Sequence, residues 1–384
     1  MQLINYGKQF VDSRDILSVK KVLLSNHLTQ GPKVQLFEKS LLKFLGGKYC
    51  TAVSSGTAAL HLLAIACNWK KNDIILTTPV SFLATANCIV YTGANPVFVD
   101  IEEKTGNICV KKLEIKIKQL KKKNKKIKAI IAMDYAGFPC NWKELKRISK
   151  KYNLTLINDN CHAVGTTLNG SHKYAIKYAD FVTLSFHPVK SITTAEGGAI
   201  ISKSKRVNNI IKSLRSHGVE KKDKKGLWFY EMQRLGYNYR ISDIHSALGI
   251  SQLQKIKQFI KKRRKIAKIY NKAFKDLPYI QIPRENNNVN SSYHLYPLRI
   301  KFNKFKINKK NFFLKLLKMG IKLQVHYIPI YKQPFYKKNF KNKTSDFKMS
   351  EKFYSEVVSL PVYFTLKEQT QKKIIEKILK LLKL

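Results

Sequence analysis

Short apolar runs rich in β-branched residues alternate with helix-forming segments from about residue 48 to residue 200, and this alternation is the feature that most restricts the fold. It predicts a mostly parallel sheet that is covered by helices on both faces. In such a sheet, ligands collect at the carboxyl ends of the strands. The predicted strands are Tyr49–Val53, Ile74–Thr77, Pro96–Val99, Ile127–Met133, Leu154–Asn158, Phe181–Phe186 and Ala199–Ser202, and the helices between them include Thr57–Asn68, Phe82–Thr92, Val110–Leu120 and Trp142–Tyr152.

Beyond residue 200 the sequence predicts a helix, then a long helix, and the remainder predicts a second and smaller α+β unit. A length of 384 residues makes two domains a reasonable expectation. We expect a large domain over residues 1–250 and a small C-terminal domain over residues 251–384. The predicted elements of this part are helices at Val207–Ser216, Asp243–Asp276, Lys309–Met319 and from Lys367, and strands at Tyr293–Lys301 and Ile321–His326.

The formal charge of +49 raises the question of a nucleic-acid partner. Only 10 of the 73 basic residues are arginine, and the lysines are spread along a chain that is also rich in Ile and Asn. These residue types share A/T-rich codons, and nucleic-acid readers usually rely on arginine and aromatic platforms. We therefore interpret the excess as solvated surface lysines and expect no nucleic-acid partner.

The remaining composition favours a cytoplasmic globular protein. No apolar run reaches the roughly 18 residues that a membrane span needs, and the N-terminus lacks the pattern of a signal peptide. The six cysteines are scattered singly, without metal-ligand or redox spacing. We expect reduced thiols, no metal site and no membrane association.

Three polar segments follow predicted strands and should therefore meet at one edge of the sheet. Ser54–Thr57 precedes a helix, where backbone N–H groups and hydroxyls suit an anion, although a plain helix cap is the alternative. Asp159 and then Lys190 follow along the chain. A phosphate cradle, a carboxylate and a lysine in this order are what a pyridoxal phosphate enzyme needs. The cofactor has an anionic phosphate, a ring nitrogen to keep protonated and an aldehyde to capture as a Schiff base.

Each of these residues has a role and a simpler alternative. Asp159 could keep the pyridinium nitrogen protonated, or it could only cap a turn. Lys190 would form the Schiff base and then move a proton at the substrate carbon, for which burial must lower its pKa; the alternative is a surface lysine. His162 could donate a hydrogen bond to Asp159 or bond the cofactor hydroxyl, and Phe82 could stack on the ring; for both, the alternative is a buried structural role. Ser185 could add a hydroxyl to the phosphate site.

An ordered set of motifs over nearly the whole chain resembles the DegT/DnrJ/EryC1/StrS family of sugar-nucleotide aminotransferases. The family has the aspartate-aminotransferase fold, fold type I, with a mostly parallel seven-stranded sheet flanked by helices. This resemblance implies a pyridoxal 5'-phosphate enzyme. The matching segments are Leu28–Gly31, Ser54–Thr57, Thr78–Phe82, Asp159–His162, Ser185–Lys190, Thr193–Gly198, Gly236–Arg240 and Ala247–Leu253.

The resemblance also implies roles for individual residues. Lys190 would be the catalytic lysine, Asp159 would contact the ring nitrogen and Phe82 would stack on the ring. Asn238 would reach a partner's cofactor across an interface, so a homodimer with shared active sites is implied. The implied phosphate-binding residues are Ser55, Gly56, Thr57 and Ser185, and the implied substrate contacts are Tyr6, Asn26, His27, Leu28, Thr29, Gly56, Ser185, Asn238, Gln324, Val325, His326 and Tyr327. The N-terminal segment would thus contribute to the substrate site.

Within the family, further segments are similar to members that act in pseudaminic acid biosynthesis. This similarity implies that glutamate donates an amino group to the C4 ketone of a UDP-linked 4-keto-6-deoxy-N-acetyl-hexosamine. Two positions depart from the pattern: His162 stands where many members have Gln, and Asn26 stands where a close relative has Lys. The segments are Ser185–Gly198, Arg215–Gly218, Tyr293–Pro297, Gln324–Tyr327 and Pro329–Tyr331.

Three alternatives stay open at this point. A dehydratase of the same fold has histidine in place of the lysine, which Lys190 argues against. Another keto sugar nucleotide could be the substrate. A basic nucleic-acid-binding protein on this fold would bind with a steep salt dependence and would carry no cofactor.

Overall fold

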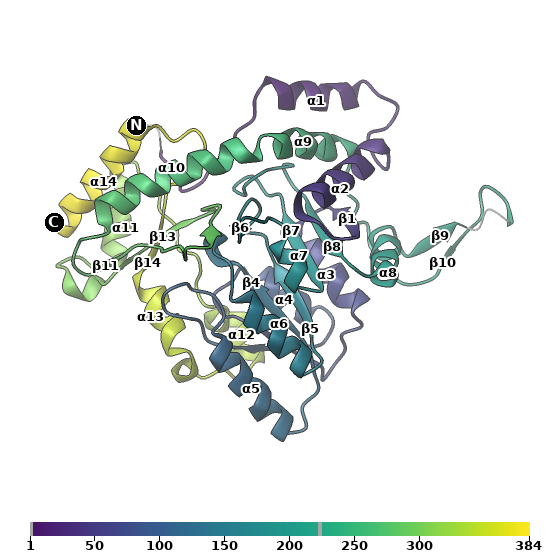
Figure 1. Cartoon of the computed structure of the whole chain (residues 1–384), viewed down its shortest axis with the longest axis horizontal. Coiled ribbons are helices and arrows are strands. Elements are labelled where there is room, and N and C mark those ends of the chain that lie inside the picture. Colours follow the sequence, from purple (N-terminus) through teal and green to yellow (C-terminus); the bar gives the residue numbers. More distant parts are fainter. Residues whose placement is uncertain (1–2, 222–224) are drawn as a thin grey trace.

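A computed structural model of the chain describes residues 3–221 and 225–384. Its centre is a seven-stranded sheet with the order β1-β8-β7-β5-β4-β2-β3 (Figure 1). Only β8 runs antiparallel to its two neighbours within this sheet, so the predicted mostly parallel sheet is confirmed. The strands are β1 (Tyr49–Val53), β2 (Ile74–Thr77), β3 (Asn95–Phe98), β4 (Ile127–Met133), β5 (Thr155–Asp159), β7 (Phe181–Ser185) and β8 (Gly198–Ser202).

Helices cover both faces of this sheet, which explains why its strands are almost continuous apolar runs. Successive side chains of a strand point to opposite faces, so Leu156 and Ile157 belong to different cores. The first core receives α2 (Pro32–Leu45), α5 (Val110–Lys122), α6 (Trp142–Lys151) and α7 (Tyr174–Tyr178), and the second receives α3 (Gly56–Ala66), α4 (Ala84–Val90) and α8 (Lys205–Arg215).

The C-terminal part forms a three-stranded antiparallel sheet with the order β11-β13-β14. Its apolar core also includes Met133, which ends β4, and Tyr135, which follows β4. The core of the C-terminal part therefore packs against the carboxyl edge of the large sheet. Its elements are β11 (Ile280–Gln281), β13 (Tyr296–Ile300) and β14 (Val357–Leu360) with α10 (Ile256–Phe274), α11 (Lys309–Lys318), α12 (Pro334–Asn339), α13 (Lys348–Glu356) and α14 (Glu368–Leu382).

Two predicted elements are wrong. The single helix predicted over residues 243–276 is divided into α9 (Asp243–Gln254) and α10 at Lys255. The ammonium group of Lys255 lies 2.7 Å from an oxygen of Asp12 and 2.6 Å from an oxygen of Asp15, which joins the break to the N-terminal segment. The strand predicted over residues 321–326 makes only isolated bridges, to Ile4 and to Ser359, because the segment passes from one partner to another.

The N-terminal helix α1 (Ser13–Leu23) is anchored on α9 by a buried carboxylate. Asp15 accepts hydrogen bonds from the hydroxyl of Ser251 at 2.6 Å and the side-chain amide of Gln252 at 2.7 Å. A buried carboxylate with several donors is costly to disrupt, so α1 is a fixed part of the fold.

A two-stranded arm projects from the body of the molecule (Figure 1). It consists of β9 (Val219–Lys221) and β10 (Tyr230–Met232). Leu227 and Trp228 near its tip are 85% and 80% exposed. The short strands β6 (Thr167–Leu168) and β12 (Val289–Asn290) form a separate pair.

Other sequence expectations concern membrane spans, metal sites and the state of the cysteines. No helix in the described part of the chain is long and apolar enough to cross a membrane. Within residues 3–221 and 225–384, no group of histidine, cysteine and carboxylate side chains is arranged to hold a metal ion. All six cysteines are free.

Candidate active site

The polar segments after β1, β5 and β7 meet at one edge of the sheet, as predicted. Both β1 and β7 are antiparallel to β8, so they run in the same direction. Strand β5 pairs in parallel with β7, and Asp159 lies beside Thr183 in the register. Residues 54–57, Asp159 and Ser185 therefore share the carboxyl edge, where ligands bind in such sheets.

The N-terminus of α3 and Ser185 form a cradle. The hydroxyl of Ser55 accepts a hydrogen bond from the amide of Ala58 at 3.0 Å, so Ser55 does cap the helix. A Cβ at Gly56 would lie 2.8 Å from Cβ of Ser185, and a Cβ at Gly198 would lie 2.3 Å from the carbonyl oxygen of Ser55. Both glycines permit this close approach, and the free amides at a helix N-terminus suit a phosphate.

Asp159 is buried at the end of β5, with its carboxylate held by two donors. The hydroxyl of Thr85 donates to Oδ2 at 2.7 Å, and the amide of Cys161 donates to Oδ1 at 3.3 Å. The hydroxyl of Ser81 lies 2.6 Å from that of Thr85. An ionised carboxylate offers about four acceptor positions, so Asp159 retains capacity for a protonated ring nitrogen.

Lys190 lies in the loop after β7 and is half-buried. Its amide donates a hydrogen bond to the carbonyl of His187 at 2.9 Å, which closes a turn. Burial lowers the pKa of Lys190, while Cys161 and Asp159 oppose the shift. The direction is the one that proton transfer by this lysine requires, since only the neutral amine can accept a proton.

Three buried histidines surround the lysine. His162 and His294 have ring centroids 4.3 Å apart, and Nδ1 of His326 lies 2.8 Å from the hydroxyl of Ser359. Burial lowers the pKa of His162 and of His294 well below the ordinary value, and lowers the pKa of His326 to about 3. Lys190 contributes to each of these shifts, so the three rings are neutral at physiological pH.

Tyr327, Phe82 and Tyr6 bring aromatic rings to the same place. The hydroxyl of Tyr327 lies 2.8 Å from Nε2 of His162. The ring centroid of Phe82 is 6.1 Å from that of Tyr327, and that of Tyr6 is 5.0 Å from that of His326. Phe82 is 54% exposed, so its ring is accessible for stacking.

Several predicted site residues are not brought into this cluster within the described part of the chain. Residues 26–29 are exposed, and backbone contacts to Ser242 and Asp243 hold Leu28 and Thr29 near the start of α9. Asn238 is exposed and pairs through its backbone with Ser216. Gln324 is exposed, and Val325 is half-buried. A single chain thus assembles the cofactor-side residues and leaves much of the predicted substrate set at the surface.

Sequence reasoning missed Thr85, Tyr135 and His294 as site residues. Thr85 lies three residues after Phe82, within the predicted helix Phe82–Thr92. Tyr135 follows β4 at the same edge of the sheet, and its hydroxyl donates to the carbonyl of His326. Position after a parallel strand was therefore a usable signal for Tyr135, whereas His294 is brought in by the packing of the C-terminal part.

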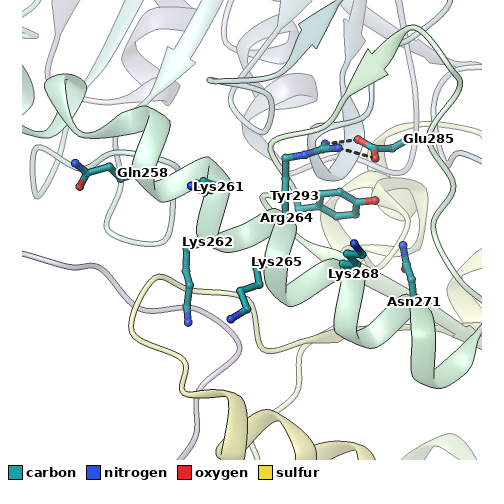
Figure 2. A pocket seen from close by; sticks show the side chains of 9 residues that line it. All are labelled: Gln258, Lys261, Lys262, Arg264, Lys265, Lys268, Asn271, Glu285 and Tyr293. Carbon is teal, nitrogen blue, oxygen red and sulfur yellow. Dashed lines mark hydrogen bonds and ion pairs between the residues drawn. The ribbon is translucent and has the colours of Figure 1, made fainter.

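A hollow of about 680 Å³ lies along α10. Four of the nine residues that line it are lysines (Figure 2). None of the predicted site residues lines it. Arg264 is already paired there with both oxygens of Glu285, at 2.5 and 3.2 Å. Lys265 lies 3.3 Å from Glu368. The groups that could act as acid, base and anion-binding residues converge instead at the Lys190 edge.

The residues at this edge fit pyridoxal phosphate. The α3 N-terminus and Ser185 would hold its phosphate, Asp159 its ring nitrogen, Phe82 its ring face and Lys190 its aldehyde carbon. The close approach of Gly56 to Ser185 supports this assignment, because a side chain at Gly56 would fill the cradle.

Comparison with known proteins points to one family. Residues 10–379 match the sequence profile of the DegT/DnrJ/EryC1/StrS aminotransferase family. A UDP-4-amino-4,6-dideoxy-N-acetyl-beta-L-altrosamine transaminase of Campylobacter jejuni is 42% identical over 364 residues, which cover 94% of this chain and 93% of the relative.

Solved structures agree. Helicobacter pylori PseC, an aminotransferase involved in the biosynthesis of pseudoaminic acid, superposes with a TM-score of 0.90 at 36% identity and full coverage of both chains. The pyridoxal phosphate form of the sugar aminotransferase Spr1654 from Streptococcus pneumoniae, described as putative, superposes with a TM-score of 0.89 at 26% identity and 99% coverage of both chains.

Proposed function

The chain belongs to the DegT/DnrJ/EryC1/StrS family of aminotransferases, and from this premise we propose that it aminates a UDP-linked sugar. The acceptor in this proposal is the C4 ketone of a UDP-linked 4-keto-6-deoxy-N-acetyl-hexosamine, and the donor is glutamate. The product would enter the biosynthesis of a pseudaminic-acid-type sugar in the cytoplasm. The observation that carries the activity is the convergence of Lys190, Asp159 and the α3 cradle on one edge of the sheet.

The residues at this edge divide the work of amino transfer. When bound, pyridoxal phosphate supplies an electron sink that stabilises negative charge at the reacting carbon. The carboxylate of Asp159 would accept a hydrogen bond from the ring nitrogen and would keep the proton of that nitrogen in place. Lys190, whose pKa burial lowers, takes a proton from the α-carbon of glutamate and later delivers a proton to C4 of the sugar. Phe82 would cover the ring face.

The sugar assignment rests on the named relatives. The Campylobacter jejuni relative is 42% identical over nearly the whole of both chains and is named for this amino sugar. The basic surface also suits the proposal, since a formal charge of +49 attracts both a pyrophosphate and a glutamate. The competing nucleic-acid hypothesis is not favoured, because the family is one of enzymes.

We also propose a homodimer with shared active sites. The arm of β9 and β10 projects from the body (Figure 1). Its residues Leu227 and Trp228 are almost completely exposed. Burial of these side chains against a second copy would remove their apolar surface from water. Asn238 and residues 26–29 would then meet the partner's cofactor or substrate. Within each chain, we propose that residues 1–250 form the large domain and residues 251–384 form the small domain.

A direct assay tests the proposed reaction. The purified protein with cofactor is incubated with glutamate and UDP-4-keto-6-deoxy-N-acetyl-hexosamine, and mass spectrometry follows both products. We expect 2-oxoglutarate and the 4-amino sugar in equal amounts. Amination of a different keto sugar nucleotide in preference would contradict the substrate, and the absence of transfer to any keto sugar would contradict the function.

A further inference from the structure

The position of one proton in His162 decides what the hydroxyl of Tyr327 can do. The amide nitrogen of Ala136 lies 3.3 Å from Nδ1 of His162, and an amide N–H can only donate. Nδ1 must therefore be the acceptor. In a neutral imidazole one nitrogen accepts and the other carries the proton, so the proton of this ring is on Nε2.

The ring is neutral because of its surroundings. Burial lowers the pKa of His162 well below its ordinary value, and Lys190 and His326 lower it further. Its single proton on Nε2 then points to the hydroxyl oxygen of Tyr327, 2.8 Å away. Tyr327 accepts this hydrogen bond, and its own hydroxyl proton is left for another acceptor.

The opposite tautomer would reverse this arrangement. With the proton on Nδ1, the ring would face the amide of Ala136 donor to donor. Tyr327 would then donate to Nε2 and would have no proton left for a ligand. Burial raises the pKa of Tyr327 well above its ordinary value, and Tyr135 and Asp159 add to this shift, so the phenol keeps its proton.

The turn that contains Ala136 also holds the main chain before Tyr327. Tyr135, next to Ala136 in the 3-10 turn Tyr135–Gly137, donates its hydroxyl to the carbonyl of His326. The amide of Tyr135 donates to the side-chain oxygen of Asn107 at 2.9 Å. One turn after β4 thus positions both the backbone preceding Tyr327 and, through His162, its hydroxyl group.

We propose that Tyr327 donates a hydrogen bond to an acceptor oxygen of the ligand bound beside Lys190, and that His162 is a positioning residue that keeps Tyr327 a donor. The inference rests on the proposed function and assigns a direction to one contact of that site. The acceptor chemistry is a carbonyl, carboxylate or phenolate oxygen. Glutamate and the keto sugar supply the first two kinds of oxygen, and the cofactor supplies the third.

The tautomer can be measured in the unmodified protein. Labelling with ¹⁵N-histidine distinguishes protonated from unprotonated ring nitrogens by NMR, and the spectrum of His162→Gln identifies the signals of His162. We expect the proton on Nε2. A proton on Nδ1 would overturn the inference, whatever the enzyme's substrate proves to be.

Kinetics test the consequence. Tyr327→Phe should lower kcat/KM for amino transfer by about 10- to 100-fold, the range expected when one hydrogen bond to a polar oxygen is lost. His162→Asn is too short to reach Tyr327 and should cause the same loss, and the double variant should be no worse than either single variant. His162→Gln places an amide nitrogen near the position of Nε2 and should restore most of the rate. His172→Gln is the matched control away from the site.

Separate measurements identify the acceptor. If it is the cofactor, Tyr327→Phe weakens cofactor binding and shifts its absorption band; if it is glutamate or the keto sugar, the kinetics with that substrate change alone. Wild-type kinetics in both substrates and unaltered cofactor affinity in Tyr327→Phe would refute the inference. Failure of the wild-type protein to transfer an amino group would instead refute the proposed function.

Discussion

Asp134 follows β4 and Asp159 ends the neighbouring strand β5, and both side chains are buried. They differ in how fully their oxygens are hydrogen-bonded. Asp159 receives two donors in the described structure, from Thr85 and Cys161. Asp134 receives five: the amide of Cys140 and the indole of Trp142, each at 2.8 Å, and the side chains of Asn158, Asn160 and Tyr174 at 3.2, 3.0 and 2.7 Å.

The difference separates a carboxylate whose oxygens are fully used by the fold from one that can still accept hydrogen bonds from a ligand. Asp134 has no acceptor capacity left for a ligand and ties β4 to β5, α6 and α7. Burial raises its pKa to about 6, and its hydrogen bonds oppose a larger shift. Asp159 keeps free acceptor positions and lies close enough to Lys190 to oppose the lowering of that lysine's pKa.

The largest expected effect is catalytic. Asp159→Asn keeps the shape of the side chain but removes the charge that holds a proton on the ring nitrogen. We expect kcat to fall by about 10³-fold, within the range for loss of a group that controls proton position. The midpoint of thermal unfolding should change little. A variant that retains wild-type kcat would place the functional carboxylate elsewhere.

Asp134→Ala should show the reverse pattern. Five donors would lose their acceptor in a buried site, so the free energy of unfolding should fall by about 3–5 kcal/mol, as when a buried charged network loses one member. Denaturant unfolding measures this loss, and the folded fraction should retain near-normal kcat. Wild-type stability with a large loss of kcat would invert the comparison between the two carboxylates.

A smaller effect is expected at Thr85. Thr85→Val replaces the hydroxyl that donates to Asp159 by a methyl group of similar size. We expect kcat/KM to fall by about 10-fold, since one charge-assisted hydrogen bond is lost. Thr85→Ser keeps the hydroxyl and is the matched control. Equal activities of the Val and Ser variants would show that this bond does not position Asp159.

The smallest effects concern pH. The folded pKa of His294 is depressed, so its stabilising contribution is present above about pH 6.5 and is lost as the pH falls below that value. The folded pKa of Asp134 is raised to about 6, so its contribution has the opposite sign and is lost as the pH rises through that value.

Between about pH 4 and 6, His294→Leu should therefore make the rise of stability with pH less steep, and Asp134→Asn should make it steeper. Each change should be at most about 1.4 kcal/mol per pH unit. Denaturant unfolding at several pH values measures the slopes. Slopes that change in the same direction would contradict the assigned shifts.

The strands, the covered sheet and the edge that carries Asp159 and Lys190 could be predicted from local patterns, because strand ends and helix starts are local features. The contrast with Asp134 could not. The carboxylate of Asp134 accepts its full set of hydrogen bonds only when Trp142 and Tyr174 donate to it, and their side chains reach it only after α6 and α7 pack on the sheet. The same holds for His294, which the C-terminal part brings against His162. Residues 321–326 look like a strand locally but change partners along their length.

The most direct test is the absorption spectrum of the purified chain loaded with pyridoxal phosphate, before and after addition of glutamate. We expect a visible band that glutamate removes and 2-oxoglutarate restores, which would show the donor half of the reaction. The band should be absent in Lys190→Ala and unchanged in Lys203→Gln, where an exposed lysine with a lowered pKa is replaced. A protein that binds no cofactor, or a Lys190→Ala variant that behaves like the wild type, would contradict the assignment of this edge as an aminotransferase centre.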